Sequence, residues 1–296
     1  MSNLATTTEQ QPVSPTQAQR LEMKRSVGMG DATQLIDFLH QHSGLSKQQL
    51  KDAANKGAVL LRRAGTARRV RRAKTELRSG DSVELHYDSA LLALQPPAAR
   101  CIADHNSYSL WYKPAGLLAQ GNEFGDHCAL TRQAETAWTP PRQVWLIHRL
   151  DREAAGLMVL AHSKQAAAKL SQQFQHNKVQ KQYRVQVRGD IGATLGQQGC
   201  FEQALDGKPA RTDFQVLSWD AQTQRSTLQV TLHTGRLHQI RRHLADAGFP
   251  VIGDPRYGVN NKSAEGLRLV AVNLAFQCPQ RRTRIEVKLA PEDIGF

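Results

Sequence analysis

The chain has 296 residues, of which 40% are hydrophobic and 6% aromatic, a composition typical of a globular protein with a sizeable core. Its 39 Lys and Arg residues outnumber its 26 Asp and Glu residues and give a net charge of +13, so we expect a polyanionic partner, nucleic acid before an acidic membrane surface. No apolar run approaches the ~20 residues that span a bilayer, and the N-terminus lacks the layout of a secretory signal. We therefore expect a cytoplasmic protein with no membrane contact. Its four cysteines are widely scattered, which argues against a zinc site or a disulfide framework.

The N-terminal third is predicted to hold a tail, a small module and a linker. Residues 1–25 are predicted to be a flexible tail, because their first part is rich in Thr, Gln, Ser and Pro and nearly free of large apolar side chains. The module, at 33–88, has these predicted elements: a helix near Leu35, a helix over 47–56 capped by Ser46, and strands at 58–61 and 83–87. Residues 89–105, with Pro96 and Pro97, are predicted to be a linker.

A dense basic run separates the two predicted strands of this module and is opposed only by Glu76. It consists of Arg62, Arg63, Arg68, Arg69, Arg71, Arg72, Lys74 and Arg78. Such a run is usually a solvated surface. Here the order of helices and strands, with Gly57-Ala58-Val59 and Gly80-Asp81-Ser82-Val83, resembles the S4 RNA-binding domain. The resemblance implies that an S4-like module binds RNA.

Residues 106–296 have a longer and more mixed pattern. Strands are predicted at 110–112, 158–161, 183–187, 212–216 and 228–232, and Ser163 is predicted to cap a helix that runs to about His176. Because strands outnumber helices and often follow one another directly, the predicted class is α+β with a mainly antiparallel or mixed sheet.

One short segment is chemically distinctive. Asp151 lies between Arg149 and Arg152, just before the apolar run 158–161. Nearby positive charge favours an ionised carboxylate, which can act as a nucleophile, a base or an electrostatic stabiliser. On composition alone, a loop salt bridge is the better interpretation of this segment.

Five blocks in this region together resemble the RluA-type pseudouridine synthases. They are Lys113-Pro114-Ala115-Gly116, His148-Arg149-Leu150-Asp151 with Gly156-Leu157, Lys181-Gln182-Tyr183 with Gly189, Thr234-Gly235-Arg236-Leu237-His238-Gln239-Ile240-Arg241, and Gly253-Asp254-Pro255-Arg256-Tyr257-Gly258. The resemblance runs in the family's order from Asn106 to the C-terminus. It implies a pseudouridine-synthase catalytic domain at 106–296. The implied activity breaks the N-glycosidic bond of a uridine in RNA, turns the base and rejoins it through carbon, with no metal or organic cofactor.

The resemblance also implies roles for particular residues. Asp151 is the implied catalytic carboxylate, and attack on the base, attack on the sugar and abstraction of a sugar proton all remain open. Arg241 is predicted to begin a helix whose core-facing stripe is Leu237, Ile240 and Leu244, and to pair bidentately with Asp151. The alternative places Arg241 on a solvated helix face.

Two further residues are implied to contact the substrate. Tyr183 is predicted to stack on the target base, which is worth ~1–3 kcal/mol; without the motif, a tyrosine in such a strand is more often a core residue. Arg149 is predicted to lie beside the vacated base stack, the alternatives being a phosphate contact or an internal salt bridge. His148, Arg236 and His238 are interpreted as structural or RNA-contacting.

The chain departs from the family pattern in two places. Ala154-Ala155 replaces the usual Thr-Ser, which we expect to alter local hydrogen bonding without removing the chemistry. The segment from Leu269 to Pro279 lacks the histidines of the corresponding family block.

Two other functional classes are weighed against this interpretation. A noncatalytic S4-type RNA-binding protein has no need to keep Asp151, Tyr183 and Arg241 together. A glycoside hydrolase normally needs a second carboxylate, and Glu153 is too close in sequence to serve. We therefore expect a monomeric RNA pseudouridine synthase that acts on structured RNA, large-subunit ribosomal RNA before transfer RNA.

Overall fold

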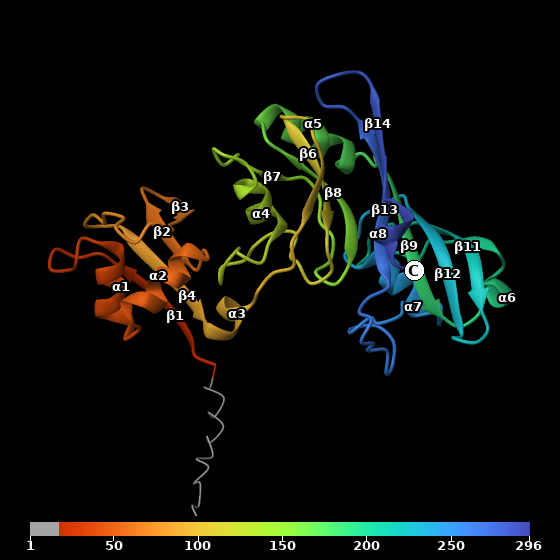
Figure 1. Cartoon of the computed structure of the whole chain (residues 1–296), viewed down its shortest axis with the longest axis horizontal. Coiled ribbons are helices and arrows are strands. Elements are labelled where there is room, and N and C mark those ends of the chain that lie inside the picture. Colours follow the sequence, from red (N-terminus) through yellow and green to blue (C-terminus); the bar gives the residue numbers. More distant parts are fainter. Residues whose placement is uncertain (1–17) are drawn as a thin grey trace, which may run out of the picture. The chain divides into compact units, whose positions relative to one another are not determined.

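A computed structural model describes residues 18–296, so most of the expected tail at 1–25 lies outside the described residues. The chain divides into two compact units (Figure 1). Unit 1 comprises residues 18–94 with 123–125, and unit 2 comprises 95–122 and 126–296. Within residues 18–296, no helix is both long and apolar enough to cross a membrane.

Unit 1 is a four-stranded antiparallel sheet covered by two helices. Its strands are β1 (Arg20–Ser26), β2 (Val59–Arg63), β3 (Thr66–Arg69) and β4 (Ser82–Asp88), in the order β1-β4-β2-β3. Both predicted helices are present, as α1 (Leu35–Ser43) and α2 (Lys47–Asn55). Ser46 caps α2 in a reciprocal capping box with Gln49. The apolar faces of these helices and strands form one core.

Two strands of unit 1 escaped prediction. Strand β1 begins inside the predicted tail, because Leu21 and Met23 alternate toward the core and β4 supplies the backbone hydrogen bonds. Strand β3 lies inside the basic run, where it forms a hairpin with β2. The hairpin turn places Ala64 and Gly65 at φ of 47° and 78°, which matches a two-residue turn of the kind that favours tight hairpins.

The predicted linker at 89–105 is mostly ordered secondary structure, so that prediction is wrong. Helix α3 (Ser89–Ala93) is capped by the Asp88 carboxylate, and strand β5 (Arg100–Asp104) pairs with the next strand. Pro96 and Pro97 therefore interrupt the chain only between these two elements. A short strand that pairs along one side only has too little periodicity to be recognised from its sequence.

Unit 2 contains a ten-stranded mixed sheet, as predicted for an α+β domain. Its order is β10-β11-β12-β9-β13-β8-β6-β5, with β14 paired to β13 and β7 to β8. The remaining strands are β6 (Tyr108–Lys113), β7 (Trp145–Leu146), β8 (Ala155–Ala161), β9 (Gln180–Arg188), β10 (Gln198–Phe201), β11 (Thr212–Asp220), β12 (Arg225–Leu232), β13 (Leu269–Gln277) and β14 (Arg284–Lys288). Strands β8 and β13 pair in parallel, whereas the other named pairs are antiparallel.

Helices pack on this sheet and help to position the site. They are α4 (Leu130–Thr136), α5 (Lys164–Gln175), α6 (Ile191–Leu195), α7 (Gln239–Asp246) and α8 (Pro291–Ile294). Ser163 caps α5 as predicted, and Ala166 and Leu170 face the core. Ile240 and Leu244 of α7 pack against the side chains of β9 and β12 in a separate core cluster. The loop before β8, strand β9 and helix α7 thereby meet.

Candidate active site

Asp151 lies in the loop that leads into β8, and the path of that loop is fixed by a glycine. Gly156 has a φ of +120°, and a Cβ there would lie 2.3 Å from the Ala271 carbonyl oxygen on β13. Only glycine fits this close backbone approach. The Ala154 N–H also donates to the Asp151 carbonyl at 3.2 Å. The Asp151 side chain itself is 23% exposed, so its carboxylate is held at the edge of the core and open to solvent.

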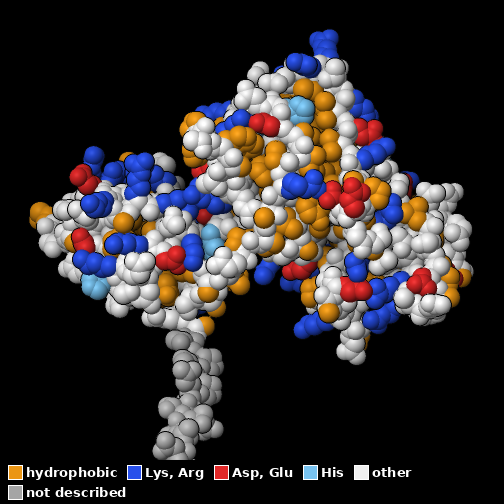
Figure 2. Space-filling model, viewed as in Figure 1, with side chains coloured by type: hydrophobic (Ala, Val, Ile, Leu, Met, Phe, Trp, Pro, Cys, Tyr) orange, Lys and Arg blue, Asp and Glu red, His pale blue; other side chains and the backbone are white. Residues whose placement is uncertain are grey.

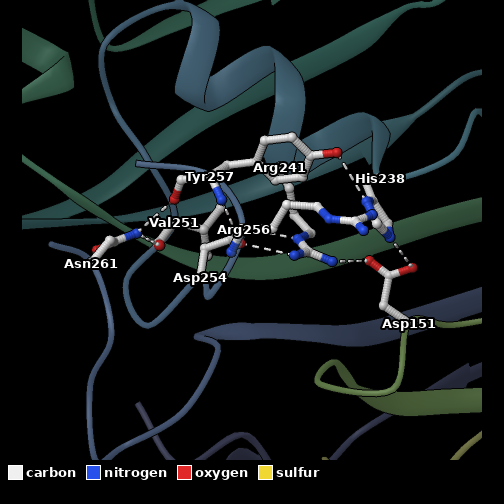
Figure 3. Close-up of polar contacts among 8 residues, drawn as sticks. All are labelled: Asp151, His238, Arg241, Val251, Asp254, Arg256, Tyr257 and Asn261. Carbon is white, nitrogen blue, oxygen red and sulfur yellow. Dashed lines mark hydrogen bonds and ion pairs between the residues drawn. The ribbon is translucent and has the colours of Figure 1, made fainter. Parts of the chain in front are cut away.

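Arg241 joins Asp151 to a second carboxylate (Figure 3). Its Nη1 donates to Asp151 Oδ2 at 2.8 Å, while its Nε and Nη2 donate to the two Asp254 oxygens at 2.6 and 2.8 Å. The predicted bidentate pairing with Asp151 is therefore wrong, because the bidentate contact, through Nε and Nη2, is made with Asp254. The solvated alternative is also wrong, since Arg241 is only 2% exposed.

Asp254 captures this edge because its own loop holds it rigidly. Its Oδ1 accepts the backbone N–H groups of Arg256 and Tyr257 at 2.9 and 3.0 Å. Asn261 donates from Nδ2 to the carbonyls of Val251 and Tyr257, which closes the loop from behind (Figure 3). A carboxylate fixed by two backbone donors presents both oxygens to the guanidinium in one plane.

The predicted core stripe on α7 is correct for two residues and wrong for the third. Ile240 and Leu244 are buried, but Leu237 is 57% exposed. The reason is that α7 begins at Gln239, and His238 before it adopts a left-handed conformation with a φ of 52°. The chain turns at His238, so Leu237 does not share the helical face.

The charges of the buried pair reinforce one another. Burial alone raises the pKa of Asp254. The Arg241 guanidinium and the two backbone N–H donors lower it by more than burial raises it, so the net shift is downward. Burial opposes the charge on Arg241, yet hydrogen bonds to Asp254 and Asp151 raise its pKa above the ordinary value. The guanidinium therefore carries a permanent charge that one buried and one partly open carboxylate share.

His238 and Tyr257 form the other side of the Asp151 surroundings. His238 Nε2 lies 3.7 Å from Asp151 Oδ1, and its Nδ1 is 3.0 Å from the Tyr257 hydroxyl (Figure 3). Burial lowers the pKa of His238, and the Asp151 charge offsets this only in part. Sequence reasoning assigned Tyr257 and Asp254 no role, although both stand in the Gly253–Gly258 block, and it did not place His238 beside Asp151.

Lys113 is a further residue whose position the sequence did not reveal. Its side chain is fully buried, and Nζ donates to the carbonyls of Pro114, Leu117 and Arg152 at 3.0, 2.8 and 3.3 Å. Burial lowers the pKa of Lys113 to about 7, against the raising effect of the Asp151 charge. Because Arg152 adjoins Asp151, Lys113 fixes the backbone next to the carboxylate. The only signal was its place in the Lys-Pro-x-Gly block.

Tyr183 lies on β9 directly across from Ala271, which in turn pairs with Gly156. The side chain is 8% exposed and packs among Ala154, Ile240 and neighbours in the core. Burial raises the pKa of the Tyr183 hydroxyl, and the Asp151 charge raises it further. The ring is thus a rigid apolar surface within electrostatic reach of Asp151.

The remaining residues named from the sequence differ in exposure and in their contacts. Arg149 is exposed, and no hydrogen bond or ion pair links it to another residue of 18–296, so the alternative of an internal salt bridge is wrong. His148 is structural, because its Nε2 accepts the Val159 N–H at 3.1 Å and its ring stacks on Phe174. Burial lowers the pKa of His148 to about 3. Arg236 donates from Nε to the Pro209 carbonyl at 3.0 Å.

The departures from the family pattern fit the local packing. Ala154 and Ala155 are 2% and 7% exposed, so their methyl groups fill core space at the position of the usual hydroxyls. None of the four cysteines forms a disulfide. Across residues 18–296 no cluster of three or more His, Cys, Asp or Glu side chains is arranged to hold a metal ion.

The arrangement suits chemistry at one ionised, oriented carboxylate. Asp151 is directed by Arg241, faces His238, and lies within electrostatic reach of the Tyr183 ring. Exposed Arg149 lies two residues away in sequence. A carboxylate fixed in this way can attack or deprotonate a bound substrate without moving.

Comparisons with known proteins agree with this geometry. The family described as RNA pseudouridylate synthase matches residues 107–246. The dual-specificity RNA pseudouridine synthase RluA of Vibrio parahaemolyticus is 32% identical over 192 residues, which cover 57% of this chain and 73% of that protein. The ribosomal large subunit pseudouridine synthase D of Nitrosomonas europaea is 36% identical over 160 residues, covering 49% and 46%. The solved structure of human RNA pseudouridylate synthase domain containing 1 shares the fold, with a TM-score of 0.56 at 22% identity over 67% of this chain and 86% of that one. The chain belongs to the RluA-type family of RNA pseudouridine synthases and is an isomerase that acts on RNA.

Proposed function

We propose that the chain converts specific uridines of large-subunit ribosomal RNA to pseudouridine, with Asp151 as the catalytic carboxylate. The observation that carries the proposal is the chain of contacts from Asp151 through Arg241 to Asp254. It holds one charged oxygen pair in a fixed direction at a partly open surface, as a reaction at a sugar–base junction requires.

Three residues complete the proposed site. Arg241 orients Asp151 through the hydrogen bond from Nη1. Tyr183 offers its buried ring to the target base, which must leave the RNA stack to reach Asp151. Arg149, exposed and without an ion-pair partner among the described residues, occupies the space that the base vacates.

Unit 1 is proposed to be an S4-like module that docks on the RNA. Its β2–β3 hairpin and the loop that follows it carry the basic run, and Lys and Arg side chains are prominent over this unit (Figure 2). Arg68 and Arg72 are exposed, and no ion pair binds them to residues 18–296. Unpaired surface cations of this density favour a phosphate backbone as the partner.

Large-subunit ribosomal RNA is proposed ahead of transfer RNA for two reasons. A strongly basic unit 1 suits a large structured RNA better than a short one. One relative is named for the ribosomal large subunit, and transfer RNA is the alternative target. We further propose that the protein acts as a cytoplasmic monomer.

Pseudouridine mapping in total RNA tests this proposal. A strain that lacks the gene is compared with its parent, and with the same strain carrying the wild type or Asp151→Asn. We expect one or a few large-subunit positions to lose the modification, and only the wild type to restore them. Losses confined to transfer RNA contradict the proposed target, and restoration by Asp151→Asn contradicts the proposed carboxylate.

A further inference from the structure

A basic pocket of about 460 Å³ lies in unit 2 between α5 and the loop that joins β13 to β14. Its charged lining consists of Lys169, Lys178, Arg281 and Arg282, with His176 beside them and no Asp or Glu. Lys and Arg side chains gather at the tip of the β13–β14 hairpin (Figure 2). None of the residues assigned to the Asp151 site lines this pocket.

The positive charge of the pocket is unbalanced over long stretches of chain. Residues 154–189 and 266–285 contain no Asp or Glu at all. Lys169 donates to the Pro279 carbonyl at 2.8 Å, which fixes the loop against α5. The side chains of Lys178, Arg281 and Arg282 make no hydrogen bond or ion pair with any residue of 18–296. Three cations thus converge on a cavity without a carboxylate to neutralise them.

The pKa of the Cys278 thiol, which lines the same pocket, indicates the sign of the local electrostatic potential. Burial raises its pKa. Four effects lower it by more than this: hydrogen bonds from the backbone N–H groups of Gln280 and Arg281, a hydrogen bond from the Tyr108 hydroxyl, and the Arg281 charge. The net shift is downward, so this loop favours negative charge. Backbone donors and guanidinium groups act together here, as they do in anion-binding loops.

Two neighbouring strands connect the pocket with the active site. Tyr183 on β9 pairs with Ala271 on β13. Lys178 stands five residues before Tyr183, and Cys278 stands seven residues after Ala271. At ~3.3 Å per residue, the pocket lies ~16–23 Å from the Tyr183 row.

A further cation lies on β9 between the pocket and the site. Lys181 is half-buried, lies two residues from Tyr183 on the same side of the strand, and makes no hydrogen bond or ion pair within the described chain. One cation without an ion-pair partner among the described residues therefore lies between the pocket and the Tyr183 row.

We propose that this pocket binds the phosphate backbone of the substrate RNA, about five to seven base pairs from the target uridine. One strand of a duplex carries a phosphate every ~3.4 Å along the axis, so ~16–23 Å corresponds to that number of pairs. The inference rests on the proposed function, because it takes the RNA seated at Asp151 as the occupant. An acidic protein segment is the competing occupant that the experiment distinguishes.

The first experiment compares R281Q/R282Q with a matched control, R225Q/K288Q. The control also removes two cations from unit 2, but at surface ion pairs with Glu265 and Glu286 that lie outside the pocket. Each protein is assayed on two transcripts of the mapped rRNA target, one with ten base pairs beside the uridine and one with three. For R281Q/R282Q we expect KM to rise roughly tenfold on the long RNA only, with kcat unchanged, and the salt dependence of binding to weaken by about two contacts.

A second experiment locates the contact on the RNA. Single neutral methylphosphonates are placed along the long transcript, and KM is measured with the wild type and with R281Q/R282Q. At the contacted phosphates, five to seven pairs from the uridine, the two changes should be non-additive because either one removes the same interaction. Additive effects at every position overturn the proposal.

The remaining outcomes separate the inference from the function on which it rests. Equal losses on both transcripts, or equal losses in R281Q/R282Q and the control, overturn the pocket. Unchanged RNA binding by R281Q/R282Q, together with lost binding of poly-glutamate, assigns the pocket to an acidic protein segment instead. If the wild type modifies neither transcript, the proposed target fails, while anisotropy titrations with a 20-base-pair RNA hairpin still test the pocket.

Discussion

The β2–β3 hairpin of unit 1 and the α7 region of unit 2 both concentrate arginine, but they use it in opposite ways. In the α7 region, Arg241 is 2% exposed and bound to two aspartates. In the hairpin and the loop that follows it, Arg68 and Arg72 are exposed without an ion-pair partner in the described part of the chain. The comparison teaches that the role of an arginine follows from which carboxylates reach it, a property that charge density along the sequence does not reveal.

Each region also contains an exception that supports this conclusion. Arg63 of the hairpin turns inward to Asp81, a carboxylate that is only 3% exposed, and thereby fixes the start of β4. Arg242, next to the buried Arg241, pairs bidentately with Asp206 at the surface, where the Asp206 side chain is 66% exposed. Neighbouring arginines can thus play different roles within one region.

The largest expected effect comes from Asp151→Asn, which keeps the shape of the side chain and removes its charge. We expect the rate of pseudouridine formation to fall by at least ~10³-fold, because the reaction loses its ionised group. The fold should remain, since Arg241 keeps both bonds to Asp254. Single-turnover assays of the purified variant measure the loss, and RNA affinity within about threefold of the wild type is the control. Substantial residual turnover would remove Asp151 from its proposed role.

The second prediction sets Asp254→Asn against Asp206→Asn, two bidentate arginine pairs that differ in burial. Asp254→Asn leaves a buried guanidinium underpaired, so the free energy of unfolding should fall by about 3–5 kcal/mol. Turnover should fall roughly 100-fold, because Arg241 no longer directs Asp151. Asp206→Asn should leave both quantities nearly unchanged, since exposed pairs contribute little. Urea unfolding and kcat measurements decide it, and similar losses in the two variants would contradict the distinction.

A third prediction concerns His148, which lies three residues before Asp151 and is kept neutral by burial. Burial lowers its pKa to about 3 from an ordinary value of 6.5, so the unfolded chain binds the proton first. Its contribution is therefore complete above about pH 6.5 and is lost as the pH falls toward 3. Between pH 7 and 4.5 the wild type should lose about 2–3 kcal/mol more than His148→Gln, which retains an acceptor for the Val159 N–H. Parallel urea-unfolding profiles of the two proteins against pH would show that His148 does not carry this dependence.

Periodicity and capping chemistry predicted five of the ten strands of unit 2, helix α5 and the two helices α1 and α2 of unit 1, because these elements bury regular apolar faces. The misses depend on partners distant in sequence. Strands β1 and β5 exist because β4 and β6 supply their hydrogen bonds, and no local pattern announces such pairing.

The same limit applies to the site. The resemblance indicated that Asp151 and Arg241 form a pair, but not that the bidentate contact of Arg241 is made with Asp254. That outcome depends on the backbone donors of Arg256 and Tyr257, which only the folded loop brings together. Lys113 was missed for the same reason, since its three carbonyl partners come from two separate loops.

The smallest expected effect on turnover tests the exposed side of the comparison. In the hairpin and the loop that follows it, Arg69 and Arg71 donate to the carbonyls of Gly57 and Asn55, so they support the fold. Arg68 and Arg72 are therefore the informative pair. Arg68→Ser with Arg72→Ser should raise KM for native-length RNA several-fold and flatten its dependence on salt by about two contacts, because each neutralised phosphate releases counterions. Saturated turnover should stay the same, since Asp151 and Arg241 belong to unit 2. The matched control, Lys47→Ser with Lys51→Ser on α2, removes the same charge from the same unit. An equal change in the control would show that net charge, and not the hairpin, attracts the RNA.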